Sequence, residues 1–247
     1  MKRHVAIFGA VMGLAFASQA NATIDLTHNY QLNGSLADSL GGPSLTLSGA
    51  ATLGATGVTI VGGHSGLTLL NALTAFSSGT AYSVQMGFTP SSVNGYRRLI
   101  NTSNNDNGFY IREGNLVYYE AGSFPGTGVF TANTPLDVVF ARDASGVSIY
   151  LNGILDSSFS PGGFSPPSSE ILADMKFFID DAGEETGGTI DFIKLYDSKL
   201  TGSDVATLYG APAAVPEPAS WAMMIMGFGL MGGMMRRRAA RTKLSFA

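Results

Sequence analysis

Residues 136–155 read LDVVFARDASGVSIYLNGIL and decide the fold class of the chain. Apolar side chains alternate along residues 136–142 and again along 147–151, which is the period of strands that bury one face. Turn-forming residues at 143–146 separate the two runs, and Asn152–Gly153 then offers the two positive φ angles that a type I′ hairpin turn requires. The stretch therefore predicts consecutive antiparallel strands joined by tight turns.

The same alternation continues through residues 23–210, with turn residues every eight to twelve positions. Residues 82–88 carry large apolar side chains at even positions, while Ser83, Gln85 and Gly87 occupy the odd ones, as expected for a sheet with one side in the core. So many strands predict an all-β sandwich of two stacked antiparallel sheets. Further strands are predicted at residues 24–30, 57–61, 98–101, 109–112, 116–120, 175–179 and 189–196.

One short helix is predicted at the end of this region. Thr201 can cap its first turn together with Asp204, Leu200 and Val205 can form a hydrophobic staple, and Gly210 can end it. The folded body is therefore expected to span residues 23–210.

The C-terminal segment has the composition of a membrane anchor. Residues 219–235 carry no charge, and as a helix they would span roughly 25 Å, slightly less than a typical hydrocarbon core. Trp221 would lie among the headgroups, and Arg236, Arg237 and Arg238 would hold the last residues in the cytoplasm. A single transmembrane helix with a basic tail, residues 219–247, is therefore predicted.

The motif Pro216–Glu217–Pro218, followed by this apolar run and the arginines, resembles the PEP-CTERM sorting tail of Gram-negative bacteria. The resemblance implies a protein that is exported, anchored transiently in the inner membrane, cut near the motif by exosortase, and delivered to the cell surface or extracellular matrix. A permanent single-pass anchor is the alternative. The linker, residues 211–218, is rich in Pro and Ala and is expected to be a stiff spacer.

The N-terminus has the pattern of a secretory signal peptide. Basic residues precede an apolar run at 5–17, and Ala20 and Ala22 supply the small side chains that signal peptidase accepts. Residues 1–22 are therefore predicted to be removed, with an uncleaved anchor as the alternative.

Without its two terminal signals the chain is acidic. Residues 23–215 contain seven Lys or Arg and seventeen Asp or Glu, a formal charge of −10. Such a field disfavours nucleic acid and anionic lipid as partners and is compatible with cations and neutral glycans. There is no cysteine, so disulfides and thiolate metal sites are excluded.

Four stretches of the body follow one another in a recognisable order: residues 30–38 (YQLNGSLAD), 136–140 (LDVVF), 149–153 (IYLNG) and 188–197 (GTIDFIKLYD). Together they resemble the laminin G-like members of the concanavalin A-like lectin and glucanase jelly rolls. The resemblance covers residues 24–209 and implies a jelly-roll sandwich. Pro135–Leu136 stands where the family often has a Trp-His pair, which marks a divergent branch.

The sequence offers no convincing catalytic residues, and we expect the protein not to be an enzyme. Retaining glycosidases on this fold carry Glu, Asp and Glu at alternate strand positions, because nucleophile and acid must lie about 5 Å apart. That triplet does not occur here, and the adjacent Glu184 and Glu185 would point to opposite faces. His64–Ser65 resembles a hydrolase elbow only in part, because Leu67 follows Gly66 where a glycine would be needed.

The acidic loop, residues 180–185 (DDAGEE), is a candidate calcium site. Calcium takes several oxygen ligands in flexible geometry, and Asp180, Asp181 and Glu185 could supply them, with Asp38 as a distant fourth ligand. The alternative is a solvated acidic turn.

A second candidate is a sugar-binding loop within residues 101–108. Asn104, Asn105 and Asp106 offer amide and carboxylate groups for sugar hydroxyls, and Tyr118 or Tyr119 could stack on a ring. The alternatives are an Asx-rich turn and tyrosines that serve only packing.

Two functions fit these features. The first is an exported module that binds extracellular polysaccharide or matrix, and the second is a structural or adhesive surface protein without a specific small ligand. A glycan-active enzyme ranks third, because no site for it was found.

Overall fold

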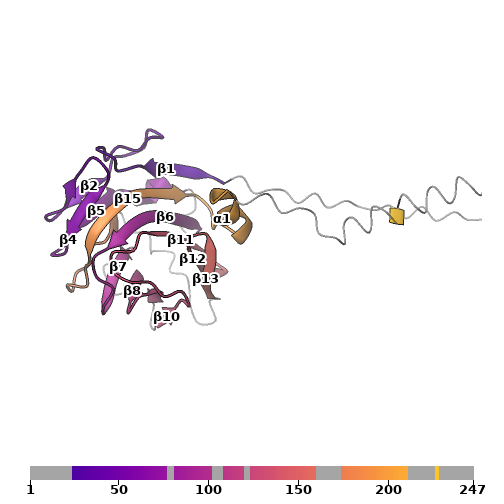
Figure 1. Cartoon of the computed structure of the whole chain (residues 1–247). Coiled ribbons are helices and arrows are strands. Elements are labelled where there is room, and N and C mark those ends of the chain that lie inside the picture. Colours follow the sequence, from indigo (N-terminus) through magenta and orange to yellow (C-terminus); the bar gives the residue numbers. More distant parts are fainter. Residues whose placement is uncertain are drawn as a thin grey trace, which may run out of the picture.

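A computed structural model describes residues 24–76, 81–101, 108–119, 123–159, 174–210 and 226–227. Two antiparallel sheets stack face to face (Figure 1), which confirms the predicted all-β sandwich. The predicted signal peptide lies outside the described residues, as do Pro216–Glu217–Pro218 and all but two residues of the predicted membrane segment. Within the part of the chain that is described, no helix has the length and apolar character to cross a membrane.

Sheet A has eight strands. Seven of them follow the order β13-β12-β11-β6-β15-β4-β3, and the eighth, β1, pairs with β15 outside this order. The strands are β1 (Leu26–Tyr30), β3 (Thr52–Leu53), β4 (Val58–Val61), β6 (Tyr82–Pro90), β11 (Leu136–Asp143), β12 (Gly146–Leu151), β13 (Ile154–Phe159) and β15 (Gly187–Tyr196).

Sheet B has seven strands in the order β10-β9-β8-β7-β14-β5-β2. They are β2 (Thr46–Ser48), β5 (Gly66–Leu70), β7 (Tyr96–Asn101), β8 (Gly108–Arg112), β9 (Asn115–Tyr119), β10 (Ser123–Pro125) and β14 (Asp174–Phe177). Two short helices complete the described fold, η1 (Ala72–Ala75) and α1 (Gly202–Leu208).

The hairpins predicted from residues 136–155 are present. Asp143 pairs with Gly146 at the first turn, and Leu151 pairs with Ile154 at the second. Asn152 and Gly153 have φ of 51° and 83°, the sign that the Asn-Gly pair predicted.

The core lies between the sheets. Sheet A contributes residues such as Val84, Met86 and Ile193, and sheet B contributes residues such as Phe109 and Ile111. All five are at most 1 % exposed, so packing of this layer is expected to supply most of the stability of a chain without disulfides.

The outer face of β6 departs from the prediction of a half-buried strand. Ser83 and Gln85 are buried as completely as the core face, because α1 and the segment before it cover this side of sheet A. Ser83 donates to the Ser198 carbonyl at 2.7 Å and accepts from the Leu200 N–H at 2.8 Å. A second apolar cluster forms under the helix, made of Val139, Ala141, Tyr150, Tyr196, Leu200 and Val205.

Helix α1 begins with the predicted capping box: the Thr201 hydroxyl accepts from the Asp204 N–H, and the Asp204 carboxylate accepts from the Thr201 N–H. Leu208 near its end and Ile24 at the start of the described body pack on the same outer cluster. Figure 1 accordingly shows α1 at the side of the sandwich where β1 begins. Both ends of the body therefore lie on the outer side of sheet A.

Four short strands were not predicted: β2, β3, β5 and β10. In β5 the residues from Gly66 to Leu69 are all buried, which removes the alternation that marks a half-buried strand. The other three contain two or three residues each, too few to show a period.

Candidate functional site

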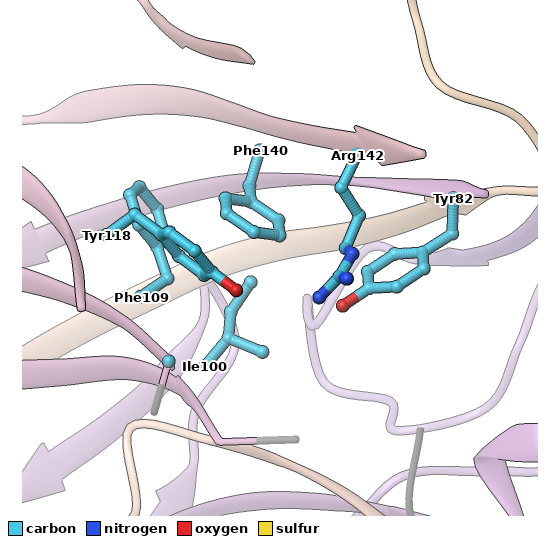
Figure 2. Close-up of a pocket in the computed structure, with 7 residues that line it drawn as sticks. Tyr82, Ile100, Phe109, Tyr118, Phe140 and Arg142 are labelled. Atoms are coloured by element: carbon cyan, nitrogen blue, oxygen red, sulfur yellow. The ribbon is translucent and has the colours of Figure 1, made fainter. Parts of the chain in front are cut away.

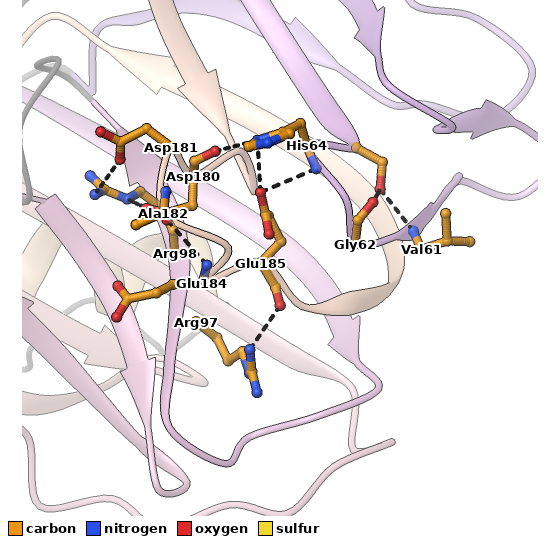
Figure 3. Close-up of polar contacts among 11 residues, drawn as sticks. Val61, Gly62, His64, Arg97, Arg98, Asp180, Asp181, Ala182, Glu184 and Glu185 are labelled. Carbon is orange, nitrogen blue, oxygen red and sulfur yellow. Dashed lines mark hydrogen bonds and ion pairs between the residues drawn. The ribbon is translucent and has the colours of Figure 1, made fainter.

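The acidic loop forms a network of internal contacts (Figure 3). Asp180, 2 % exposed, accepts from Arg98 Nε at 2.6 Å and from the N–H groups of Ala182 and Glu184 at 2.6 and 3.1 Å. Burial alone would raise the pKa of Asp180, but the Glu184 and Ala182 N–H groups and the Arg98 guanidinium outweigh it and lower the pKa. Asp180 is therefore an ionised carboxylate whose partner is Arg98.

Glu185 is held by His64, from the turn between β4 and β5. The His64 N–H donates to Glu185 Oε1 at 3.1 Å, and His64 Nδ1 lies 3.0 Å from the same oxygen and 2.6 Å from the Asp180 carbonyl oxygen. Arg97 donates to the Glu185 carbonyl at 3.1 Å. The loop is thus tied to two neighbouring segments (Figure 3).

Asp38, the proposed fourth calcium ligand, belongs to a different network. Its carboxylate accepts from the N–H groups of Asn29, Leu40 and Gly42 at 2.8 to 3.0 Å and lies 3.9 Å from His28 Nε2. Within the described ranges, no group of three or more His, Cys, Asp or Glu residues has an arrangement that could hold a metal ion. The contacts therefore do not assemble the predicted set of ligands, and calcium binding stays a prediction.

The outer face of sheet B carries a group of aromatic and cationic side chains that we call the tyrosine–arginine patch: Tyr96, Arg98, Tyr110, Arg112 and Tyr119. Their strand neighbours Leu99, Phe109, Ile111 and Leu116 belong to the core, so the alternating patch residues point the other way. Tyr96 pairs with Arg112 across the β7–β8 hairpin, and Arg98 pairs with Tyr110. The register thus brings the five residues together.

The three tyrosine rings of the patch pack edge to face, with centroids 5.6 to 6.3 Å apart and interplanar angles of 76° to 81°. Each arginine stacks on one ring: the Arg98 guanidinium lies 4.6 Å from the centre of Tyr110, and that of Arg112 lies 4.7 Å from Tyr96. Such cation–π contacts fix side chains that would otherwise be mobile. Arg112 is exposed, and Tyr96 and Tyr119 are half-buried.

Arg98 joins the patch to the acidic loop. Fully buried, it lies between the Tyr110 ring and the Asp180 carboxylate, and its Nη2 is 3.7 Å from Asp181 Oδ1. The Asp181 side chain is 57 % exposed, so one acceptor lies at the edge of the patch. The acidic loop thus holds Arg98 against the ring of Tyr110, which is itself 1 % exposed.

The two predicted stacking tyrosines have separate places. Tyr119 belongs to the patch, as a ring on the outer face. Tyr118 is 4 % exposed and packs inside the sandwich against Phe140, with ring centroids 5.7 Å apart. It cannot stack on a polymer in this conformation, which corrects the prediction for Tyr118.

Tyr118 lines a small pocket with Tyr82, Ile100, Gly108, Phe109, Phe140 and Arg142 (Figure 2). Figure 2 shows the Arg142 guanidinium beside the Tyr82 hydroxyl. Burial raises the pKa of Tyr82, and Arg142 offsets only part of that effect. The pocket measures about 10 Å³, the space of a single water molecule, so it is too small for a sugar ring.

Asn104, Asn105 and Asp106 lie outside the described residues. The residues on either side of that segment, Asn101 and Gly108, pair with each other at the ends of β7 and β8. The sugar-binding role of the three residues stays a prediction.

Arg98, Arg112, Tyr96 and Tyr110 were not identified from the sequence. Their signal was present, because Tyr-x-Arg occurs at residues 96–98 and again at 110–112. The repetition becomes meaningful only when the register of β7 and β8 is known.

The family of the chain follows from comparison with known proteins. The model of the concanavalin A-like lectin/glucanases superfamily matches residues 61–206, more than half of the chain, and the protein belongs to this superfamily. The PEP-CTERM protein-sorting motif matches residues 214–239. Both resemblances seen in the sequence are confirmed, and the motif supports export with membrane-associated processing in a Gram-negative bacterium. Among curated proteins none matches this chain.

Solved structures agree with the fold. Domain 4 of AbnA, a GH43 extracellular arabinanase from Geobacillus stearothermophilus in complex with arabinotriose, has a TM-score of 0.58 and 21 % identity over 75 % of this chain and 98 % of that domain. Trypanosoma rangeli sialidase gives 0.59 and 18 % over 75 % of this chain. The receptor binding domain of botulinum neurotoxin C/D mosaic serotype gives 0.56 and 17 %, also over 75 %. This chain covers 32 % of the sialidase and 51 % of the toxin domain.

Proposed function

We propose that this protein is an exported surface or matrix protein that binds a carbohydrate polymer through the tyrosine–arginine patch. The observation that carries the proposal is the pair of half-buried rings, Tyr96 and Tyr119, beside the exposed Arg112. Tyrosine combines an apolar ring with a polar hydroxyl, and a guanidinium adds several donors in a fixed plane. Those are the groups that the apolar face and the hydroxyls of a sugar would contact.

Export follows from the sorting motif, and the finer route belongs to this proposal. Signal peptidase removes residues 1–22, the tail holds the protein in the inner membrane, and exosortase cuts near Glu217. Intact-mass measurement on protein from the native host tests the route. A chain that begins at Thr23 and lacks residues 219–247 is expected, whereas a mass that retains Arg236–Arg238 would favour the permanent anchor.

The proposed role is binding without catalysis. Asp180 and Glu185, the buried carboxylates of the acidic loop, contact Arg98 and His64 respectively. These contacts support a structural role for the two carboxylates. Incubation with polysaccharides should release no product. Product release that is lost in Glu185→Gln would overturn this part of the proposal.

A polysaccharide panel tests the binding surface. The full chain in detergent is expected to be retarded by one or more polymers in affinity electrophoresis, and Tyr119→Ala should weaken the retardation about tenfold or more. Lys194→Ala is the matched control, because it removes another cation–π contact, 4.9 Å from Phe192 on sheet A, and leaves the patch intact. Equal loss in both variants, or no retardation by any polymer, would favour a structural or adhesive protein.

A further inference from the structure

The tip of the β12–β13 hairpin exposes apolar side chains. Ile154 and Leu155 follow the Asn152–Gly153 turn and are 73 % and 54 % exposed, and Tyr209 at the end of α1 is 36 % exposed. We call Ile154, Leu155 and Tyr209 the hairpin tip.

Tyr209 fixes the point where the C-terminal segment leaves the body. Its ring packs on Gly153 so closely that an added Cβ would lie 2.8 Å from Tyr209 Cγ, and its N–H donates to the Val205 carbonyl at 3.2 Å. Gly210 is the last described residue of the body. The sorting tail therefore begins beside the two exposed aliphatic side chains of the hairpin.

The length of the tail restricts how far the hairpin tip can move from a membrane. The uncharged run begins at Ala219, and the residues between Gly210 and Ala219 reach at most about 30 Å when fully extended. Their Pro and Ala content favours an extended spacer over a compact one. While the tail is attached, the hairpin tip stays within about one body diameter of the lipid surface.

We propose that the hairpin tip docks into the headgroup region of the bilayer while the tail is attached. The inference rests on the membrane attachment that is part of the proposed function. Docking turns the end of the sandwich that carries the β12–β13 turn and the end of α1 towards the membrane.

Several features favour lipid over a protein as the occupant. The tip is the protruding end of a hairpin, and its two exposed aliphatic side chains match the acyl-chain side of the membrane interface. The short tether gives a high effective concentration, so a small apolar contact is sufficient. Because the body carries a charge of −10, docking should be strongest on zwitterionic lipid and weaker on anionic lipid at low salt.

The absence of cysteine from the chain allows a direct test. The full chain carrying Leu155→Cys is labelled with an environment-sensitive fluorophore and reconstituted into phosphatidylcholine vesicles that contain lipid-attached quenchers. Leu70→Cys, at the end of β5 and similarly exposed at 47 %, is the matched control. Quenching at position 155 is expected to exceed that at position 70 at least threefold, and to fall when phosphatidylglycerol is added at low salt.

A second substitution distinguishes insertion of the hairpin tip from insertion of the fluorophore alone. Ile154→Asp in the Leu155→Cys background should reduce quenching at position 155 to the level at position 70, with an unchanged melting temperature. If quenching stays the same, the label itself enters the lipid and the docking proposal is overturned.

Flotation of the vesicles distinguishes a failure of membrane attachment from a failure of docking. If the chain does not float with vesicles, the membrane attachment fails and the docking fails with it. If it floats but positions 155 and 70 are quenched equally, attachment stands and docking is overturned. Shielding of position 155 in native membranes but not in protein-free vesicles would identify a protein as the occupant and would also overturn docking to lipid.

Discussion

The outer faces of the two sheets are built from different chemistry. On sheet A, α1 covers the strands with an aliphatic cluster that includes Leu200 and Val205. The polar groups beneath the helix satisfy one another: the Tyr196 hydroxyl donates to Gln85 at 2.9 Å, and the Gln85 amide donates to Asp137 at 3.0 to 3.1 Å. On sheet B, the described outer face carries tyrosines and arginines, of which Arg98 and Tyr110 are buried and Arg112 is exposed.

This difference indicates a division of roles between the two faces. Burial raises the pKa of Tyr196 to about 12, as expected for a hydroxyl whose place is inside the fold. Arg112 on sheet B is exposed instead, and the rings beside it are half-buried. In the proposed function, the outer face of sheet A contributes to stability, and the outer face of sheet B binds the partner.

Breaking the Arg98–Asp180 pair beside the tyrosine–arginine patch should have the largest effect on thermal stability. Asp180→Asn removes the nearest carboxylate of a fully buried guanidinium, and loss of one partner of a buried pair costs about 3–5 kcal/mol. For a body of this size that is a fall in Tm of roughly 10 °C. Asp181→Asn, at the exposed side chain 3.7 Å from the same arginine, should change Tm by a degree or two. Equal effects in thermal melts would show that Asp180 is not the anchor of the patch.

The pH dependence of stability is an independent test of how much the Arg98–Asp180 pair contributes. The pKa of Asp180 is lower in the fold than the ordinary 3.8, so its stabilisation is present above about pH 4 and is lost as the pH falls through the folded-state pKa. Chemical denaturation of the wild type should therefore lose stability more steeply below pH 4 than that of Asp180→Asn. Parallel curves would mean that Asp180 does not carry this part of the acid sensitivity.

Leu200→Ala probes the covered face. Leu200 is 1 % exposed in the cluster beneath α1, and truncation of a buried leucine costs about 2–5 kcal/mol. Urea denaturation should show that loss. Val61→Ala, at a side chain that is 64 % exposed on β4, should shift the midpoint very little. A small effect of Leu200→Ala would mean that the helix contributes little to the stability of sheet A.

Calcium should change the thermal stability of the protein less than any of these substitutions at buried residues. An ion at the acidic loop would have to share Asp180 and Glu185 with Arg98 and His64, and millimolar calcium could stabilise such a site by no more than about 1.4 kcal/mol. The rise in Tm over a chelator control should be a few degrees at most, and Asp181→Ala should remove it. Equal melting temperatures in the two buffers would leave the loop as a support for Arg98 alone.

The sequence predicted the parts of the fold that depend on local patterns. Alternation located β11, β12 and most of the other strands, and Thr201 and Asp204 predicted the capping box, because both signals arise from neighbouring residues. The coverage of Ser83 and Gln85 was missed, since it depends on a helix more than a hundred residues away in the chain. Strand β5 was missed for the related reason that a strand buried on both faces shows no period.

The candidate site was predicted less completely than the fold. Tyr119 was identified as a stacking residue, but its partners come from β7 and β8, and only the register of that hairpin brings them together. The acidic loop was predicted as a calcium site, and that prediction is untested. Its role was not visible in the sequence, because Arg98, the partner of Asp180, is 82 residues away.

The most direct test measures binding and stability together in two variants. For any polymer that retards the wild type, Arg112→Ala on sheet B should weaken binding about tenfold or more and leave Tm within about 2 °C, since the side chain is exposed. Leu200→Ala, in the cluster that covers sheet A, should lower Tm by several degrees or more and leave the affinity unchanged at a temperature where the variant is folded. Unchanged binding in Arg112→Ala, with lost binding in folded Leu200→Ala, would contradict the assignment of the binding surface to sheet B.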